Sequence, residues 1–517
     1  MPSTLYSIYT AQRALATNQA AIDIINSNVA NINTKGYSKQ RVEISQMSSV
    51  SRYQNPLDAS QENMGCIIDA VTRNRDMFID SSFRQETSEV NYYKEYSDFA
   101  VQIENIMDEM GESGLSSALD DFYNGLSQLA ANPNDFVVRN SLVSAAETLA
   151  TKFNDIYSDL QTMRTNLVGD ISNPSTLDES KLSLMADDLN TKLASVADLN
   201  RKINLSTSQG IQPNSLLDER DMLLDQISEY IPATFRLESN NTVTVSLGTV
   251  QLVSGIERTG FFTVQLGDAD NPSLLQIEND GGSVFSSDAY SLADSGKIGA
   301  ILQLGGSDTD KLTINGLITS LNTLASEFAD AVNTIQTNGR YIDNAISPSE
   351  LSNNTTNPID GAEPLDADPE AFFVDSDLSG TITAGNIAVN STISSNPYQI
   401  AAADLTAGFN DTGNGANALL MSQVRDTNIA GIGGITTQQY LLNTIGQLGT
   451  QSKNLQDNHE VKENILGYVN QKRESVTGVN LDEELADLIR FQKAYEASAR
   501  VMSVVKDNLS IIMNMVK

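Results

Sequence analysis

The sequence predicts an elongated, multidomain α+β protein, with paired coiled-coil-like helical N- and C-termini, a helical bundle in the middle and small inserted β domains. Three observations support this prediction. Apolar residues recur every seven positions at both ends of the chain, helical periodicity fills most of the interior, and strand-like alternation replaces it after residue 233. At roughly 100–200 residues per domain, the 517 residues form about three or four domains.

The first helix is predicted over residues 5–32, because no glycine occurs before Gly36 and no proline between Pro2 and Pro56. Its heptad a positions hold Ile8, Leu15, Ile22 and Val29. Its d positions hold Ala11, Asn18, Ile25 and Ile32. An a/d stripe sustained over four heptads is typical of a coiled-coil seam.

The C-terminus repeats this pattern without Gly or Pro after Gly478. Its a positions hold Leu481, Leu488, Tyr495, Met502, Leu509 and Val516. Its d positions hold Phe491, Val505 and Ile512, interrupted by Glu484 and Ser498. Because neither helix can bury a narrow stripe alone, we predict that the two pack on each other and then on copies from neighbouring subunits. The alternative is that each helix docks on its own domain.

The interior alternates between helical and β-like segments. Helical periodicity covers 90–165, with a break at 132–135, and returns at 180–205, 213–231, 297–338 and 417–475. From about residue 233, Val243, Val245 and Leu247 alternate with polar residues, which predicts strands. Residues 339–400 are rich in Asn, Ser, Thr, Pro and Gly and predict a second β or loop insertion. The chain therefore runs out and returns, with helical ends at one pole and β modules at the other.

We divide the chain into three predicted parts. Residues 1–40 with 475–517 form a terminal helical assembly domain. Residues 41–232 with 297–338 and 401–474 form a helical rod domain, and residues 233–296 with 339–400 form outer β-rich insertions.

Charge is distributed unevenly along this chain, whose net charge is −34 and whose pI is near 4.2. Such an acidic chain repels nucleic acid and anionic membrane surfaces, so neither is an expected partner. Residues 1–45 carry +2 and residues 475–517 carry −1, which leaves −35 for the middle. Because like charges resist packing, we expect the nearly neutral ends to touch neighbours and the middle to face solvent.

The single cysteine and the N-terminal residues indicate in which cellular compartment the protein could reside. Cys66 stands alone, so no internal disulfide forms. This fits either a reducing compartment or a chain threaded unfolded through a narrow export channel. Residues 1–17 lack the features of a Sec-type signal peptide, and no apolar run approaches the ~18 residues of a membrane span.

We predict no catalytic, cofactor or metal site. The single histidine, His459, excludes an HExxH metalloprotease and any multi-histidine metal site. Residues 375–380 match the start of an EF-hand loop, but position twelve is Asn386 in place of a bidentate glutamate, so we interpret this segment as a tight turn. The glycines of 430–435 lack the preceding strand of a phosphate-binding turn.

Four segments resemble the family of flagellar rod, hook and hook-associated proteins. SNVANINTKGYSKQ (27–40) and NLDEELADLIRFQKAYEASARVMSVVKDNL (480–509) are similar to the terminal signatures of these axial proteins. SLLDERDMLLDQIS (215–228), and the pair GNIAVNSTI (385–393) and GNGANALLMSQV (413–424), resemble the hook-associated members at the hook–filament junction. The resemblance covers about three quarters of the chain.

The resemblance implies a non-enzymatic structural subunit that joins hook to filament and is needed for filament assembly. It implies export to the outside by the flagellar type III apparatus without a cleaved signal, and a cytoplasmic export chaperone on the C-terminal helix. The implied partners are further copies in an annulus, the hook protein and the second junction protein. The alternatives are a hook or distal rod subunit, a secreted coiled-coil adhesin and, most remotely, an enzyme.

Periodicity adds a mechanism to this implied role. Terminal helices that are poorly ordered in the free subunit would gain apolar partners on assembly. Burial of their apolar surface would stabilise the assembly by roughly 25 cal/mol per Å², and the entropy cost of ordering the helices would oppose it. In the first signature, Asn31 and Asn33 favour caps and turns, and Gly36 supplies a left-handed or bend position. The predicted assembly surface comprises Ile8, Leu15, Ile22, Val29, Asn31, Asn33, Gly36, Tyr37, Leu481, Leu488, Phe491, Tyr495, Met502, Val505, Leu509 and Ile512.

Overall fold

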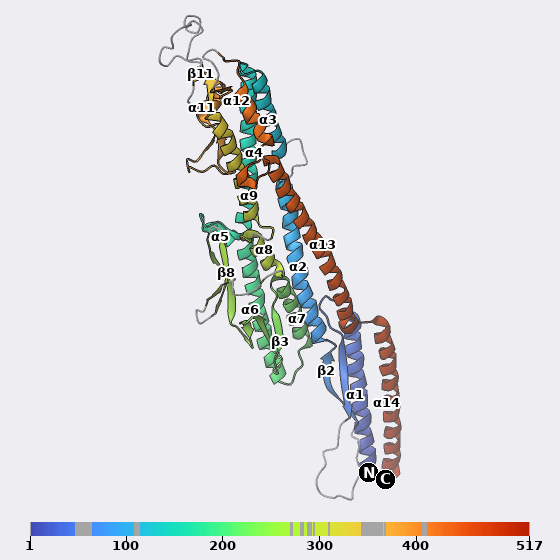
Figure 1. Ribbon diagram of the computed structural model, residues 1–517. Coiled ribbons are helices and arrows are strands. Elements are labelled where there is room, and N and C mark those ends of the chain that lie inside the picture. Colours follow the sequence, from blue (N-terminus) through green and yellow to red (C-terminus); the bar gives the residue numbers. More distant parts are fainter. Residues whose placement is uncertain are drawn as a thin grey trace, which may run out of the picture.

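A computed structural model describes the chain over most of its length. The described residues are 2–46, 65–107, 114–268, 272–279, 284–286, 292, 295–308, 311–342, 365–366, 369–405 and 411–515. Figure 1 shows an elongated molecule with both chain ends at the same pole and helices running along its length. The predicted α+β class with paired helical ends is confirmed.

The lower end of the molecule in Figure 1, which we name the terminal part, contains two long helices and a hairpin. Helices α1 (Pro2–Ala30) and α14 (Leu481–Met515) lie side by side in opposite directions. Strands β1 (Gln40–Gln46) and β2 (Cys66–Arg73) pair antiparallel and contact α1. The predicted start of the helical rod domain at residue 41 is wrong, because β1 and β2 form a two-stranded ribbon that packs on α1.

The rest of the molecule, which we name the rod, is built around long helices. Polar side chains cap the N-termini of several of these helices. Asp76 accepts from the amides of Phe78 and Ile79, Asp135 accepts from that of Val137, and Thr436 forms a capping box with Gln439. The rod helices are α2 (Met77–Ile106), α3 (Leu115–Ala131), α4 (Phe136–Val168), α5 (Ser175–Glu179), α6 (Lys181–Ser208), α7 (Asn214–Tyr230), α8 (Gly296–Gly305), α9 (Ile314–Gln336), α11 (Ser391–Ser395), α12 (Ala416–Gln423) and α13 (Thr437–Thr477), with short 3-10 turns at Pro397–Gln399, Val424–Asp426 and Ala430–Ile432.

A first hydrophobic core joins the middle of the rod to a β module. Strands of the module form two antiparallel sheets, in the orders β3-β4-β5-β6 and β7-β8-β9. Their bounds are β3 (Thr234–Leu237), β4 (Val243–Leu247), β5 (Val250–Ser254), β6 (Glu257–Arg258), β7 (Gly260–Leu266), β8 (Ser273–Asn279) and β9 (Val284–Ser286). Buried Val245, Leu252 and Ile277 pack in one cluster with α2, α6, α7 and α8. The predicted alternation at 243–247 is confirmed as β4.

A second hydrophobic core fills the far end of the rod. The rings of Phe122, Phe328 and Phe373 lie with centroids 5.2–5.5 Å apart, in the geometry that aromatic pairs prefer. Segment 369–405 covers this core with short elements. The strands beyond residue 338 are β10 (Gly339–Ile342), β11 (Leu365–Asp366), β12 (Phe373–Asp375), β13 (Ile387–Val389) and β14 (Ala403–Asp404).

Several predicted elements need correction. We grouped 233–296 with 339–400 as β modules at one pole, but the first module packs on the middle of the rod and the described part of the second packs on its far end. The predicted helix from residue 90 begins at Met77, capped by Asp76, and residues 297–338 form two helices instead of one. The break at 132–135 is confirmed, and so is a helix over 213–231, which spans Asn214–Tyr230.

Candidate functional site

The structure brings the two predicted heptad helices, α1 and α14, together. Half-buried side chains include the predicted Ile8, Leu15, Ile22, Val29, Leu488, Phe491, Met502 and Leu509. Val505 is buried, whereas Leu481 and Tyr495 are exposed. The side chain of Ile512 lies outside the described residues. Their role as an assembly surface stays a prediction.

Helix α14 keeps a second set of apolar side chains in solvent. The exposed set on this helix comprises Leu481, Leu485, Ile489, Tyr495, Val501, Val504, Ile511 and Met513. Ile489 and Val504 are 60% and 57% exposed although buried Glu484 and Val505 lie on the same helix. Exposed apolar side chains gathered on one helix are typical of a surface that another molecule covers.

Asn28, at the last turn of α1, is a fully satisfied buried amide. Its Oδ1 accepts from the Tyr37 hydroxyl at 2.8 Å and from the Gln40 amide at 3.0 Å. Its Nδ2 donates to the Gln40 carbonyl at 2.9 Å and to Glu484 Oε2 at 3.0 Å. The 27–40 signature therefore has a structural meaning: Asn28 and Tyr37 join α1, the start of β1 and α14.

Lys39 completes this contact between α1, β1 and α14. Its Nζ lies 3.0 Å from buried Glu484 and 2.9 Å from exposed Glu483. Burial alone would lower the pKa of Lys39, but its hydrogen bonds to Glu483 and Glu484 outweigh burial and raise it. Burial also raises the pKa of Tyr37, whose hydroxyl therefore stays protonated as a donor.

The loop between α1 and β1 follows the predicted turn chemistry. Asn31 Nδ2 donates to the Ser27 carbonyl, and Asn31 Oδ1 accepts from the Thr34 hydroxyl. Gly36 has φ +83°, so the predicted left-handed position is confirmed. Asn33 is exposed and lines the cleft described below.

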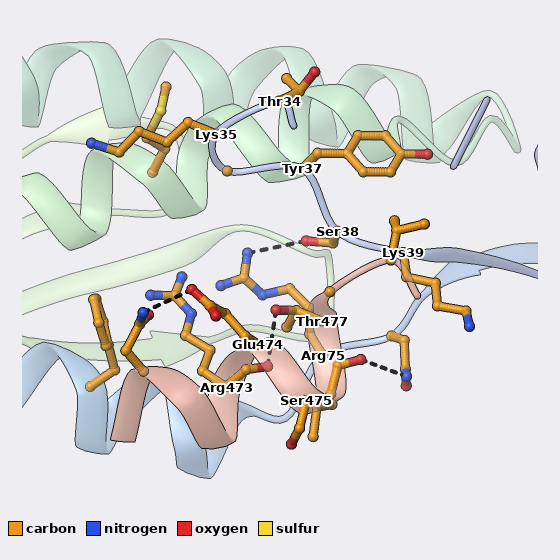
Figure 2. A pocket seen from close by; sticks show the side chains of 18 of the residues that line it. Thr34, Lys35, Tyr37, Ser38, Lys39, Arg75, Arg473, Glu474, Ser475 and Thr477 are labelled. Atoms are coloured by element: carbon orange, nitrogen blue, oxygen red, sulfur yellow. Dashed lines mark hydrogen bonds between the residues drawn. The ribbon is translucent and has the colours of Figure 1, made fainter. Parts of the chain in front are cut away.

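We name the region where the terminal part meets the rod the joint. The chain passes between the two at Asn74–Asp76 and at Gly478–Asn480, and the α1–β1 loop reaches the same place. Backbone hydrogen bonds connect these segments: the Lys39 amide donates to the Thr477 carbonyl at 2.8 Å, and the Asn74 amide donates to the Lys39 carbonyl at 2.8 Å. Together they line a cleft of about 970 Å³ (Figure 2).

Helix α7 presents three carboxylates to the joint, which we name the acidic face of α7: Asp218, Asp221 and Asp225. Four arginines lie among these carboxylates and Asp80, and each arginine contacts two of them at 2.6–3.5 Å. These arginines are Arg73 of β2, Arg75 of the first crossing, Arg84 of α2 and Arg473 of α13. Four carboxylates and four arginines thus pair in a region that is largely shielded from water.

Asp221 lies at the centre of this network. Burial alone would raise its pKa, but the guanidinium groups of Arg75, Arg73 and Arg84 outweigh burial and lower it. The same ion pairs raise the pKa of Arg75 against the effect of burial. Asp221 and Arg75 therefore stay charged at neutral pH.

Sequence reasoning missed the joint, although a signal was present. Asp218, Asp221 and Asp225 follow i, i+3, i+7 spacing, which places them on one side of a helix. The same helix buries Leu217, Leu224 and Ile227. Their arginine partners come from β2, the first crossing, α2 and α13, so pairing across the fold was not visible in the chain order.

We searched the described part of the chain for metal-binding groups and for membrane-spanning helices. No group of three or more His, Cys, Asp and Glu side chains there is arranged to hold a metal. In the EF-hand-like segment, the Asn386 amide donates to Asp377 Oδ1 at 2.9 Å, and the Gly380 amide donates to Asp375 Oδ2 at 2.6 Å. None of the described helices combines the length and apolarity that a membrane crossing requires.

Three family models match separate parts of the chain. Residues 100–347 match the helical domain of flagellar hook-associated protein FlgK. Residues 470–515 match the C-terminal region of the flagellar basal body rod FlgEFG proteins, and residues 8–37 match the flagella basal body rod protein. The two terminal matches fall on α14 and α1, and the first falls on the rod.

Similar proteins align with nearly the whole chain. Flagellar hook-associated protein 1 of Bacillus subtilis is 27% identical over 99% of this chain and 99% of its own length. Flagellar hook-associated protein 1 of Escherichia coli is 24% identical over 98% of this chain and 99% of its own length. The structure of the flagellar hook junction protein FlgK from Burkholderia pseudomallei superposes with a TM-score of 0.58 at 15% identity, covering 77% of this chain and all of that one, which shows a shared fold.

Proposed function

We propose that this chain, which belongs to the family of flagellar hook-associated protein 1, is a structural subunit that joins the flagellar hook to the filament and is needed for filament assembly. The observation that carries this proposal is the terminal part. There α1 and α14 pack on each other at one pole, while α14 keeps Ile489, Val504 and six further apolar side chains in solvent.

The exposed set of α14 supports self-assembly through the ends of the molecule. Covering one valine- or isoleucine-sized side chain contributes about 1.5–3 kcal/mol, so several such contacts per subunit offset the entropy of ordering. The nearly neutral termini oppose this association less than the acidic middle does. Subunits therefore associate through their terminal parts, and the rods face outward.

The finer assignments belong to the same proposal. We infer that the subunit acts in an annulus between the hook protein and the second junction protein, outside the cell. We infer export by the flagellar type III apparatus without a cleaved signal, with a cytoplasmic chaperone on α14 before export. The exposed apolar side chains of α14 support the chaperone, because such a surface needs cover in the cytoplasm. We propose that the subunit is structural and has no catalytic activity.

Deleting the gene tests the proposal. Cells examined by electron microscopy should carry hooks without filaments, and unpolymerised flagellin should appear in the medium. Missing hooks would instead assign the protein to the hook or distal rod. Normal filaments would contradict the proposal. A secreted coiled-coil adhesin, in contrast, would oligomerise alone in solution.

A further inference from the structure

We propose that Asp218 is a positioning residue, which fixes the angle between the terminal part and the rod. This inference rests on the proposed function, because subunits that associate through their terminal parts fit an annulus only if each rod leaves its terminal part in the same direction. The contacts of Asp218, compared with those of its neighbours on α7, carry the argument.

Among the described residues, the side-chain hydrogen bonds of Asp218 reach partners on the terminal side of the joint. Its Oδ1 accepts from the Ser38 hydroxyl at 2.7 Å and from Arg73 Nη1 at 2.8 Å. Its Oδ2 accepts from the Ser38 amide at 3.3 Å. One carboxylate of the rod therefore holds both the α1–β1 loop and the last residue of β2.

Asp225, two turns along the same helix, makes a different set of contacts. It pairs with Arg84 Nε at 2.8 Å and with Arg473 Nη2 at 2.6 Å. Those arginines come from α2 and α13, which are both rod helices. The acidic face of α7 is thus divided: Asp218 connects rod to terminal part, Asp225 connects rod helices to each other, and Asp221 contributes to both.

Neighbouring side chains fix the geometry of the groups that Asp218 contacts. The Ser38 hydroxyl also lies 3.5 Å from Arg75 Nη1, and Figure 2 shows these two side chains pointing toward each other. Arg75 in turn makes a double contact with Asp80 at 2.8 and 2.9 Å. Because the ion-paired side chains here are no more than one-fifth exposed, salt screens them weakly and their geometry stays defined.

Without the contacts of Asp218, the two parts stay joined by the ion pair of Arg73 with Asp221 and by Asn214 of α7, whose Nδ2 donates to the Val71 carbonyl at 2.9 Å. The remaining links are two short crossings and their backbone hydrogen bonds. The first crossing contains Asn74, Arg75 and Asp76, and the second contains Gly478, Val479 and Asn480. Short unclamped crossings permit rotation of one part against the other. Replacing Asp218 therefore leaves both parts folded and widens the range of angles between them.

Distance measurement between two spin labels on the full-length chain tests the proposal. The labels are placed at exposed Asp69 of β2 and exposed Glu463 of α13, each replaced by cysteine in a Cys66→Ser background. We expect one narrow distance distribution in this parent and in the matched control Asp225→Ala. We expect a broad or shifted distribution in Asp218→Ala and a narrower one in the charge-keeping variant Asp218→Glu. Circular dichroism verifies that each variant keeps its helix content.

Three outcomes would overturn the proposal: a broad distribution already in the parent, an unchanged one in Asp218→Ala, or equal broadening in Asp225→Ala. Should Asp218→Ala fail to fold, Asp218→Asn takes its place with the same expectations. The gene-deletion phenotype is scored separately. A narrow, Asp218-independent distance together with missing filaments would therefore contradict only the positioning role, whereas normal filaments in the deletion strain would contradict the junction role itself.

Discussion

Asn28 and Glu484 lie 456 positions apart in the chain, and their side chains meet at 3.0 Å in a buried contact between α1 and α14. Glu484 is only 2% exposed, and its other partner is Lys39. A polar pair inside an otherwise apolar helix contact costs stability but favours one register, because any shift leaves buried groups unpaired. The pair thus fixes how the two ends of the chain align.

Replacing Glu484 should loosen the pairing of the chain ends. In Glu484→Ala, Asn28 and Lys39 each lose a buried partner, so the opening free energy of the last turn of α1 should fall by about 2 kcal/mol. Hydrogen exchange of the α1 amides measures this change. Glu483→Ala is the matched control, because Glu483 also contacts Lys39 but has a side chain that is 67% exposed, and its exchange should match that of the parent chain. Equal protection in both variants would contradict the prediction.

Acid should weaken the joint through Asp221. Its pKa is lowered in the folded chain, so its stabilising contribution is complete above the unfolded value of about 3.9 and is lost as the pH falls through the folded value. Asp221→Asn removes a carboxylate that contacts Arg73, Arg75 and Arg84, which should lower the free energy of unfolding by about 3 kcal/mol at pH 7. The difference between parent and variant should shrink below about pH 4.

Urea unfolding followed by circular dichroism at several pH values between 7 and 3 measures this dependence. Glu219→Gln is the control, because Glu219 lies on the same helix but is exposed, and it changes the net charge by the same amount. Its pH profile should follow that of the parent. A constant difference between Asp221→Asn and the parent across the whole range would show that the charge of Asp221 is not responsible.

Arg139 holds the far end of the rod through carbonyl groups instead of carboxylates. Its guanidinium is fully buried and donates to the carbonyls of Pro133, Pro397 and Ile400 at 2.7, 3.0 and 2.9 Å. Burial lowers the pKa of Arg139 to about 10, so it remains charged at neutral pH. Because one planar group satisfies carbonyls from two distant segments, Lys cannot replace it.

Arg139→Met should therefore lower the free energy of unfolding by about 3 kcal/mol and release segment 369–405 from α4. Limited proteolysis should cut that segment earlier than in the parent, and Arg139→Lys should restore protection only in part. Arg201→Met is the control, since the Arg201 side chain is 60% exposed. If Arg139→Met resists proteolysis as the parent does, the carbonyl contacts do not hold the segment.

Local structure could be predicted from the sequence, but the contacts of the joint could not. The apolar stripes through Leu15 and Leu488 predicted both terminal helices, because a heptad repeat is a local pattern. The hairpin β1–β2 was missed, although Val42 and Ile44 alternate with polar residues, because the alternating run is short and neither strand buries a side chain fully. Contacts such as Ser38 with Asp218 depend on how the chain returns on itself, which periodicity does not encode.

Glu484 shows the same limit within a correctly predicted helix. It breaks the apolar d row of the C-terminal helix, and from the sequence this looked like an imperfection. In the structure the carboxylate is buried because Asn28 and Lys39 are there to receive it. A polar residue in an apolar stripe is thus a signal for a specific partner, but the partner itself comes from the other end of the chain.

Assembly should depend on the exposed apolar side chains of α14 more than the folding of the free chain does. Val504→Asp adds one charge where a neighbour is expected to cover an apolar side chain, so filaments should be lost while the melting temperature of the purified subunit stays unchanged, because Val504 is 57% exposed. Ser503→Asp is the matched control: it adds the same charge at the adjacent exposed position and should leave filaments intact. Val505→Asp, at a buried position beside α1, should instead lower the melting temperature. Electron microscopy of complemented deletion cells, together with thermal melting of each purified variant, separates these effects. Normal filaments in Val504→Asp would show that the exposed side of α14 is not the contact between subunits.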